Sequence, residues 1–207
     1  KRIFELQSPT GQVWSLDLSP RGDFFAFGTA ENFTHVIQTS GNQFIKKLPG
    51  YSVAISPSGK SLATSSIDGQ LHFFETTDFK NIKTINAHSK SIPRIRFSST
   101  GRFLVSASLD KTAKIWDLKK KKDPIVLPHE APVLMGTFSP NGEVVATSTS
   151  TNQILLWQTR SGQQIGELKG HQNRVYAVAF SPQNRIIASG GHDGKIKFWD
   201  WREERLL

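Results

Sequence analysis

The feature that most constrains the fold of this chain is a repeat of about forty residues that recurs five times. Short apolar segments end in turns, mostly of Ser-Pro type, whose serines are spaced 37, 42, 41 and 42 residues apart. A large apolar or aromatic residue follows each turn with the same four spacings. Two markers that keep one register indicate a repeated structural unit. The turn serines are Ser19, Ser56, Ser98, Ser139 and Ser181, and the later markers are Ile37, Phe74, Trp116, Trp157 and Trp199.

Each unit is expected to contain four short β-strands. In the last unit, residues 175–180 and 186–190 are β-rich runs on either side of a proline-containing turn, and residues 195–199 alternate with period two. A fourth run, such as residues 81–85 or 164–168, closes the unit. No window of helical length shows an amphipathic stripe. The sequence therefore predicts an all-β chain built from four-stranded antiparallel sheets.

The composition excludes several classes of protein. The 207 residues include 26 Lys+Arg, 17 Asp+Glu and no cysteine, and 37% of them are hydrophobic. Without cysteine the chain has no disulfide framework, thiolate metal site or cysteine nucleophile. No stretch reaches the roughly 18 consecutive apolar residues that a membrane helix needs. We therefore expect an intracellular protein, in the cytoplasm and/or the nucleus, whose net charge of +9 favours acidic partners.

The repeats resemble the WD-repeat β-propeller family. The resemblance rests on Gly170-His171 followed by Trp199-Asp200, and on Ala87-His88 followed by Trp116-Asp117, and it spans essentially the whole chain. It implies a single domain over residues 1–207 in which each sheet is one blade around a central channel. It also implies a noncatalytic scaffold that docks other protein subunits. The second half, with its tail at residues 198–206, is similar to the WD-repeat subunit of the Ski and Paf complexes.

The number of blades is open, because most rings in this family have seven. Residues 2–6 resemble a fourth strand without its three predecessors. Either this strand completes the last blade and seals a five-bladed ring, or residues 202–207 begin that blade's own fourth strand within a larger ring. Since Lys1 is not an initiator and Met135 is the only methionine, we favour the second alternative, a portion of a longer chain.

The short first spacing of 37 residues lies between Ile37 and Ser56. Residues 48–51 stand there in place of a longer loop. Either this loop is short, or residues are missing from the sequence at this point.

Two repeats contain His, Ser, Asp and Trp in one register, which invites a hydrolase interpretation. A catalytic triad is built once, beside an open cleft, and its serine normally lies on an exposed turn. Here the set occurs twice and each serine falls inside a predicted strand. The family resemblance implies a structural network in which Asp and Trp are linked through His and Ser. The two sets are His88, Ser106, Asp110 and Trp116, and His171, Ser189, Asp193 and Trp199.

The other repeats depart from this register. The fourth has His129, Thr147 and Trp157, but Thr151 stands where the aspartate is expected, so its network lacks a charged acceptor and should be looser. The first and second repeats lack both the histidine and the tryptophan at these positions. We expect those blades to depend on packing rather than on polar networks.

Aromatic and apolar residues recur near the strand ends that the resemblance places on the top face of a propeller. Such residues are enriched among the hot spots of protein interfaces, and an arginine beside them could pair with an acidic partner residue. The alternative is that several of these side chains fold inward against neighbouring blades. The predicted partner-binding top rim contains Trp14, Tyr51, Ile67, Leu109, Leu134, Arg174, Tyr176 and His192.

Basic residues gather in the turns of the opposite face. They form a candidate surface for phosphates or acidic peptides, so nucleic acid is an alternative partner. The lysine run lacks interleaved aromatic residues for base stacking, however, and such runs are usually solvated. The predicted basic lower rim contains Arg21, Lys60, Arg102, Lys119, Lys120, Lys121, Lys122 and Arg185.

The sequence offers no motif for a metal, a cofactor or a small-molecule substrate. The remaining histidines are scattered, and no glycine-rich phosphate loop precedes a helix. Gly190 and Gly191 fall at a strand end, where close backbone packing explains them. We therefore expect no cofactor, no membrane partner and no enzymatic activity.

Overall fold

A computed structural model of the chain describes residues 11–120 and 122–207. The described strands form five sheets, each with four antiparallel strands, as the repeat pattern predicts. The first sheet contains β1 (Val13–Leu18), β2 (Phe24–Thr29), β3 (Phe33–Gln38) and β4 (Phe44–Pro49), and the second β5 (Ser52–Ile55), β6 (Ser61–Ser65), β7 (Gln70–Glu75) and β8 (Asn81–Asn86). The third contains β9 (Arg94–Phe97), β10 (Phe103–Ala107), β11 (Thr112–Asp117) and β12 (Ile125–Pro128). The fourth contains β13 (Val133–Phe138), β14 (Val144–Thr149), β15 (Ile154–Gln158) and β16 (Gln164–Leu168), and the fifth β17 (Val175–Phe180), β18 (Ile186–Gly191), β19 (Ile196–Asp200) and β20 (Arg205–Leu206).

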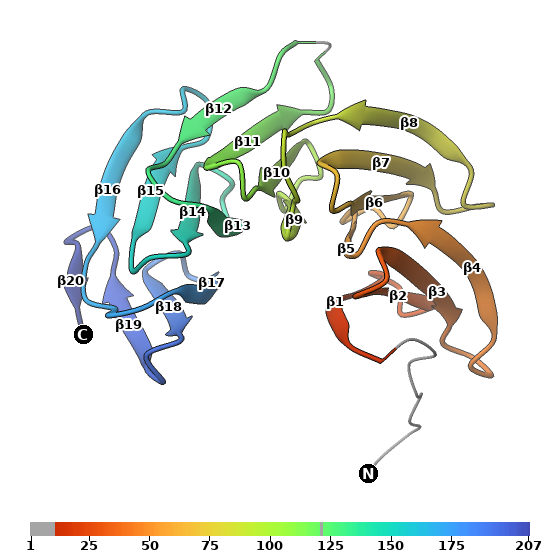
Figure 1. Ribbon diagram of the computed structural model, residues 1–207, viewed down its shortest axis with the longest axis horizontal. Coiled ribbons are helices and arrows are strands. Elements are labelled where there is room, and N and C mark those ends of the chain that lie inside the picture. The colour runs from red at the N-terminus through yellow and green to blue at the C-terminus, as the bar shows by residue number, and fades with distance from the viewer. Residues whose placement is uncertain (1–10, 121) are drawn as a thin grey trace.

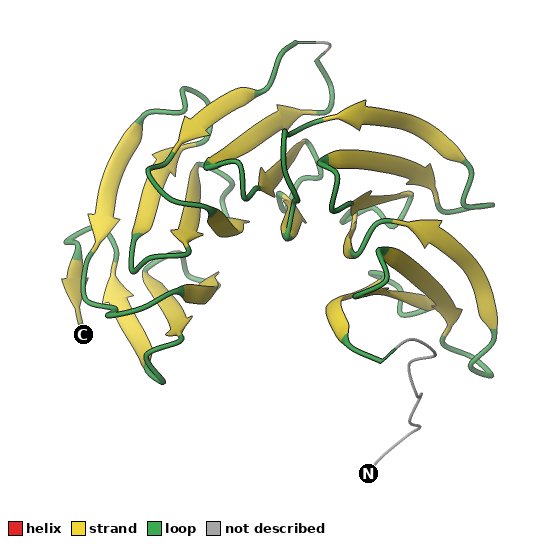
Figure 2. Ribbon diagram, in the orientation of Figure 1, coloured by secondary structure: helices red, strands yellow, loops and turns green. Residues whose placement is uncertain are grey.

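The sheets follow one another as the blades of an open arc (Figure 1). Within each blade the strands are paired in chain order, with the first strand on the inner side of the arc and the fourth on the outer side. The described part of the chain consists of strands and loops (Figure 2), and it contains no helix long and apolar enough to cross a membrane.

The open arc can be compared with the two predicted alternatives, a sealed five-bladed ring and a portion of a larger ring. The last blade has its own fourth strand, β20, because Trp199 pairs with Leu206 and Asp200 with Arg205. The first and last blades do not meet in Figure 1, so the five described blades do not seal a ring. In the five-bladed alternative residues 2–6 take the place that β20 occupies, and the number of blades in the ring stays a prediction. Residues 2–6 themselves lie outside the described residues.

The core is divided among the junctions between blades. Period-two alternation turns one face of each sheet toward its neighbour, and four buried apolar clusters result, one at each junction. At the junction of the second and third blades, for example, Leu71 packs in one cluster with Ile95 and Leu104. Each such side chain contributes about 1.5–3 kcal/mol when it is fully buried. The blades therefore hold one another, and loop positions are fixed by packing.

The connection between the first two blades is short. Only Gly50 and Tyr51 separate β4 from β5, and Gly50 has a φ of 94°, a conformation that glycine adopts without strain. A β-carbon on Gly28 would lie 1.7 Å from the carbonyl oxygen of Tyr51, so this glycine lets the connection lie directly on β2. The 37-residue spacing thus reflects a two-residue connection.

Candidate functional site

The antiparallel topology divides the turns and connections between two rims. We define the lower rim as the turns that join the first strand of a blade to the second and the third to the fourth. The top rim is then formed by the turns between second and third strands and by the connections between blades. The predicted partner-binding residues lie in the top-rim turns and connections or in the strand ends next to them, and the described members of the predicted basic set lie in the lower-rim turns.

The third blade contains the first His-Ser-Asp-Trp set as a continuous chain of hydrogen bonds. Trp116 Nε1 donates to Ser106 Oγ at 2.9 Å, and Ser106 Oγ lies 2.8 Å from His88 Nε2. On the other side of the ring, His88 Nδ1 lies 2.9 Å from Asp110 Oδ2. Since Ser106 accepts from the indole, its hydroxyl proton is available for His88 Nε2, and Nδ1 carries the proton that Asp110 accepts. The network therefore ties the connection that carries His88 to three strands or turns of the blade.

The fifth blade repeats this geometry. Trp199 Nε1 donates to Ser189 Oγ at 2.8 Å, Ser189 Oγ lies 2.8 Å from His171 Nε2, and His171 Nδ1 lies 2.8 Å from Asp193 Oδ2. The backbone N–H of Gln172 also donates to Asp193. Both network serines are buried inside strands. Because both hydroxyls are buried they are not accessible to a substrate, and the structural role of the networks stays a prediction.

The electrostatics of the third blade agree with a neutral histidine beside a charged aspartate. Burial lowers the pKa of His88 to about 4, against the opposing effect of Asp110. Burial raises the pKa of Asp110, but hydrogen bonds from Thr112 and His88 outweigh it and bring that pKa down to about 2. The carboxylate thus remains an anionic acceptor, which makes its hydrogen bonds strong.

The fourth blade has the incomplete network that its sequence predicts. Trp157 Nε1 donates to Thr147 Oγ1 at 2.8 Å, and Thr147 Oγ1 lies 2.7 Å from His129 Nε2. In place of an aspartate, the backbone oxygen of Leu127 lies 2.9 Å from His129 Nδ1. Thr151 instead bonds Thr149 at 2.8 Å. In the first blade an aromatic stack replaces the network, because Phe27 lies parallel to His35 with ring centres 5.2 Å apart.

Five of the eight predicted top-rim residues are exposed. Trp14 is 49% exposed, Tyr176 is 48% exposed and Ile67 is 56% exposed. The Trp14 ring stands edge-on against Tyr51 with centroids 5.3 Å apart, and Tyr176 stands edge-on against the exposed ring of His192 at 5.9 Å. These contacts orient the rings while leaving large parts of them in solvent.

Tyr51 departs from the predicted top rim. It is only 3% exposed, and its hydroxyl lies 2.7 Å from Ser91 Oγ in the connection to the third blade. The two-residue connection pulls this ring inward, so Tyr51 supports Trp14 and the junction rather than meeting a partner. Leu109 and Leu134 are half-buried, and Arg174 is exposed.

A cavity at the inner side of the arc contains residues that the sequence analysis missed. It has a volume of about 540 Å³, and Arg94, Arg96, Met135, Tyr176 and Ile196 line it. Arg94 Nη1 donates a long hydrogen bond of 3.5 Å to Ser15 Oγ. Burial and the neighbouring charge of Arg96 lower the pKa of Arg94. Arg94 and Arg96, two residues apart and shortly before the turn at Ser98, are the signal in the sequence that points to this cavity.

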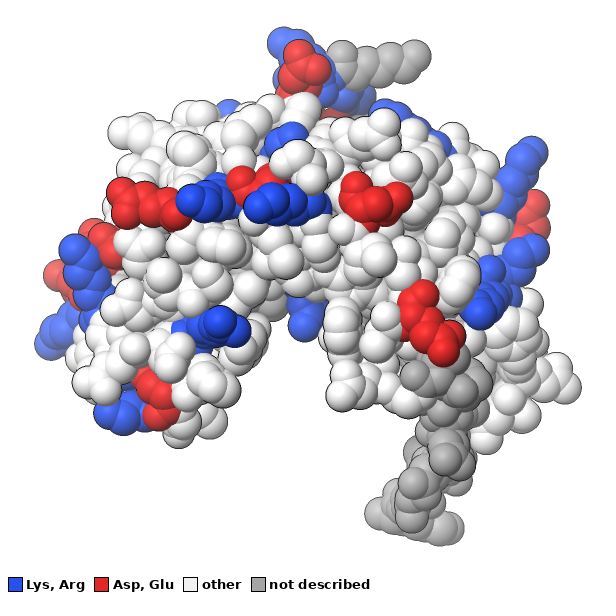
Figure 3. All heavy atoms as spheres, viewed as in Figure 1, with Lys and Arg blue, Asp and Glu red and all other residues white. Residues whose placement is uncertain are grey.

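The basic lower rim is less uniform than its sequence predicts. Arg102 forms a bidentate ion pair with Asp117, 2.9 Å at its shortest, so its charge is compensated. Lys119, Lys120 and Lys122 are exposed in the loop between β11 and β12, whereas Lys121 lies outside the described residues. On the face drawn in Figure 3, Lys and Arg side chains lie next to Asp and Glu along the upper arc. Arg21, Lys60 and Arg185 are exposed.

Within residues 11–120 and 122–207, no group of three or more His, Asp or Glu side chains is arranged to hold a metal ion.

The repeats match known proteins. The family model "WD domain, G-beta repeat" matches residues 42–75, 79–117 and 162–200, which together make up more than half of the chain. The Periodic tryptophan protein 2 homolog of Dictyostelium discoideum is 27% identical over 100% of this chain and 24% of its own length. Pre-mRNA-processing factor 19 homolog 2 of Arabidopsis thaliana is 24% identical over 93% of this chain and 39% of its own length.

Protein HIR1 of Mycosarcoma maydis is 26% identical over 76% of this chain and 19% of its own length. The chain thus spans only about a fifth to two fifths of the length of these curated relatives. The five in-register blades, the duplicated His-Ser-Asp-Trp networks and the matched repeats lead to one assignment: the chain belongs to the WD-repeat family.

Proposed function

We propose that this protein is a noncatalytic docking platform that binds other protein subunits of a multisubunit complex through its top rim. The observation that carries the proposal is the exposure of two large aromatic side chains, Trp14 and Tyr176, on the same rim of a packed arc. Aromatic residues of this kind dominate the energetics of protein interfaces.

The mechanism is display of a preorganised surface. Trp14 and Tyr176 are oriented by edge-on contacts with Tyr51 and His192, and the blades that carry them are fixed by the buried clusters between sheets. A partner that covers these rings therefore orders few side chains of the platform, and the entropy cost of association on this side is small. Arg174, exposed two residues before Tyr176, offers a charge for an acidic residue at the edge of such an interface.

Affinity purification of the full-length protein from its own cells, with and without nuclease treatment, tests this function. Mass spectrometry of the retained proteins identifies the partners. We expect protein partners that survive nuclease and that are depleted when both Trp14 and Tyr176 are replaced by alanine. Loss of every partner on nuclease treatment would contradict the docking platform.

A second candidate function is binding of nucleic acid through the lower rim. It is favoured by the exposure of Lys119, Lys120 and Lys122 in one loop, and it is weakened by the ion pair that compensates Arg102. This function predicts binding to an oligonucleotide that falls steeply with salt and is lost when the lysine run is replaced by serine. A binding constant that does not depend on salt would exclude it.

A further inference from the structure

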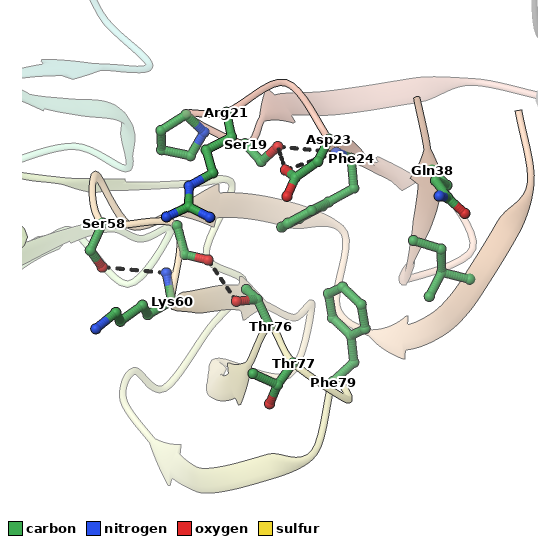
Figure 4. Close-up of a pocket in the computed structure, with 13 residues that line it drawn as sticks. Ser19, Arg21, Asp23, Phe24, Gln38, Ser58, Lys60, Thr76, Thr77 and Phe79 are labelled. Carbon is green, nitrogen blue, oxygen red and sulfur yellow. Dashed lines mark hydrogen bonds between the residues drawn. The ribbon is translucent and has the colours of Figure 1, made fainter. Parts of the chain in front are cut away.

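The first and second blades enclose a pocket at the lower rim that the docking platform does not use. Its volume is about 550 Å³, within the range of pockets that hold ligands. The turn between β1 and β2, the turn between β5 and β6, and the loop between β7 and β8 contribute its walls. Figure 4 shows Arg21 and Lys60 toward one end of the pocket and Phe79 and Gln38 toward the other.

The cationic end contains two basic side chains and one carboxylate, that of Asp23. Among the described residues, neither Arg21 nor Lys60 has an ion pair or a side-chain hydrogen bond, in contrast to Arg102 in the third blade, which is paired with Asp117. The Asp23 carboxylate accepts hydrogen bonds at Oδ1 from the hydroxyl of Ser19 and the backbone N–H of Phe24. The bond from Ser19, together with the charge of Arg21, lowers the pKa of this carboxyl, so it stays anionic. Two cations against one carboxylate leave this end with a net positive charge, which favours an anion from outside.

The position of Arg21 follows from a difference between the turns. In three other blades the residue two places after the turn serine bonds that serine: Ser58 lies 3.1 Å from Ser56 Oγ, and Thr100 and Asn141 make the equivalent contacts. In the first blade Asp23 bonds Ser19 instead. Arg21 is thereby released from the inward contact, and its guanidinium extends toward Ser58 and Thr76 of the second blade (Figure 4).

The other end of the pocket combines the polar side chain of Gln38 with the apolar side chains of Phe79 and Ile45, and Phe79 has a strained backbone conformation. Phe79 has a φ of 55°, in the left-handed region that bulky residues avoid. Asn42 and Gly162, residue types that tolerate this conformation, occupy the matching loops of the first and fourth blades. The Phe79 ring crosses the junction and stands edge-on against Phe24 with centroids 5.5 Å apart. Phe79 is only 7% exposed, so Ile45, which is 38% exposed, supplies most of the apolar surface that a ligand can reach.

We propose that this pocket binds a short acidic peptide segment of a partner protein, with a carboxylate at Arg21 and Lys60 and a neighbouring apolar side chain over Phe79 and Ile45. Charge complementarity selects the acidic residue, and the apolar end selects against a bare phosphate backbone, which has no side chain to place there. An extended peptide advances about 3.3 Å per residue, so both groups fall within a few residues of one another.

Panning of a phage-displayed library of random decapeptides on the 207-residue chain tests this proposal. We expect selected peptides to carry Asp or Glu within about four residues of Phe, Leu or Ile. In fluorescence anisotropy, Arg21→Ser and Lys60→Ser should each weaken such a peptide about fivefold, as for a partly exposed charge pair. Ile45→Ser should weaken it as well. Arg185→Ser, an exposed cation on the same rim outside the pocket, is the matched control and should change nothing.

Three results would overturn the proposal: no selected peptide, selected peptides without acidic residues, or equal binding to the Arg21→Ser/Lys60→Ser double variant. A labelled oligothymidylate provides the nucleic-acid arm. If the oligonucleotide binds the original chain but not the double variant, and if no acidic peptide is selected, then the pocket is a phosphate site and the peptide proposal fails. The substituted residues are exposed and lie on the opposite rim from Trp14 and Tyr176. A negative result for this pocket therefore does not contradict the proposed top-rim docking platform, and a negative result for the platform does not contradict the peptide proposal.

Discussion

A β-carbon on Gly191 would lie 2.6 Å from Nδ1 of His171, so β18 approaches the connection from the fourth blade more closely than a side chain permits. This added β-carbon would also lie 2.7 Å from Oδ1 of Asp193. The glycine therefore makes room for the bond between His171 and Asp193 at the top of the fifth blade.

Gly191→Ala should lower the free energy of unfolding by about 2–4 kcal/mol, because the new methyl group displaces one member of a buried network. Gly190→Ala is the matched control, since its β-carbon would meet only Ala177 at 3.7 Å. Chemical denaturation of both variants measures the difference. Equal stability of the two variants would show that the close approach at Gly191 is unimportant.

Ser106→Ala should cost about 2–4 kcal/mol, because it leaves both Trp116 Nε1 and His88 Nε2 buried without their partner. Ser89, an exposed serine next to His88, provides the control, and Ser89→Ala should be nearly neutral. Urea denaturation followed by tryptophan fluorescence gives both values. A cost for Ser106→Ala no larger than that of the control would contradict a stabilising role for the network.

Stability should fall as the pH decreases from about 6.5 toward 4. Burial lowers the pKa of His88 and of His129 to about 4 from the ordinary value of 6.5. In this range the unfolded chain binds protons that the native blades exclude, so each histidine removes up to about 1.4 kcal/mol per pH unit. The stabilisation is fully present above pH 6.5 and is lost as the pH falls through the folded pKa.

The slope of the unfolding free energy against pH checks this prediction. His129→Asn, which does not titrate, should reduce the slope. A stability that is constant between pH 6.5 and 4.5 would refute the assignment of neutral buried histidines.

Much of the fold could be predicted from the sequence because the same pattern of strand and turn residues occurs five times. The turn serines and the later aromatic markers place each strand, and the duplicated register places both networks. The identity of the blade neighbours follows from chain order, since each blade packs against the next along the chain. The narrower resemblance to the WD-repeat subunit of the Ski and Paf complexes stays a prediction.

Single side chains were harder to predict, because their exposure depends on contacts between blades. Tyr51 has the sequence position of a rim residue, yet the short connection and the absent β-carbon of Gly28 draw it inward. The sequence position of Arg102 predicts a free surface cation. In the structure Asp117 pairs across the strands with Phe103, the neighbour of Arg102, and so lies close enough to form an ion pair with Arg102. The pocket at the lower rim of the first two blades is lined by residues from both blades. Because these residues are far apart in the sequence, no local sequence pattern predicts the pocket.

Trp14 and Tyr176 are proposed to bind a partner as preorganised residues of a rigid rim. The affinity of a partner for the Trp14→Ala/Tyr176→Ala double variant tests this most directly. Both rings are half exposed, so their removal should leave the melting temperature within a few degrees of the original. Isothermal titration with a partner recovered after nuclease treatment should show binding weakened at least about 30-fold, as loss of one hot spot of 2 kcal/mol would produce. Unchanged affinity in a variant that remains folded would contradict the account.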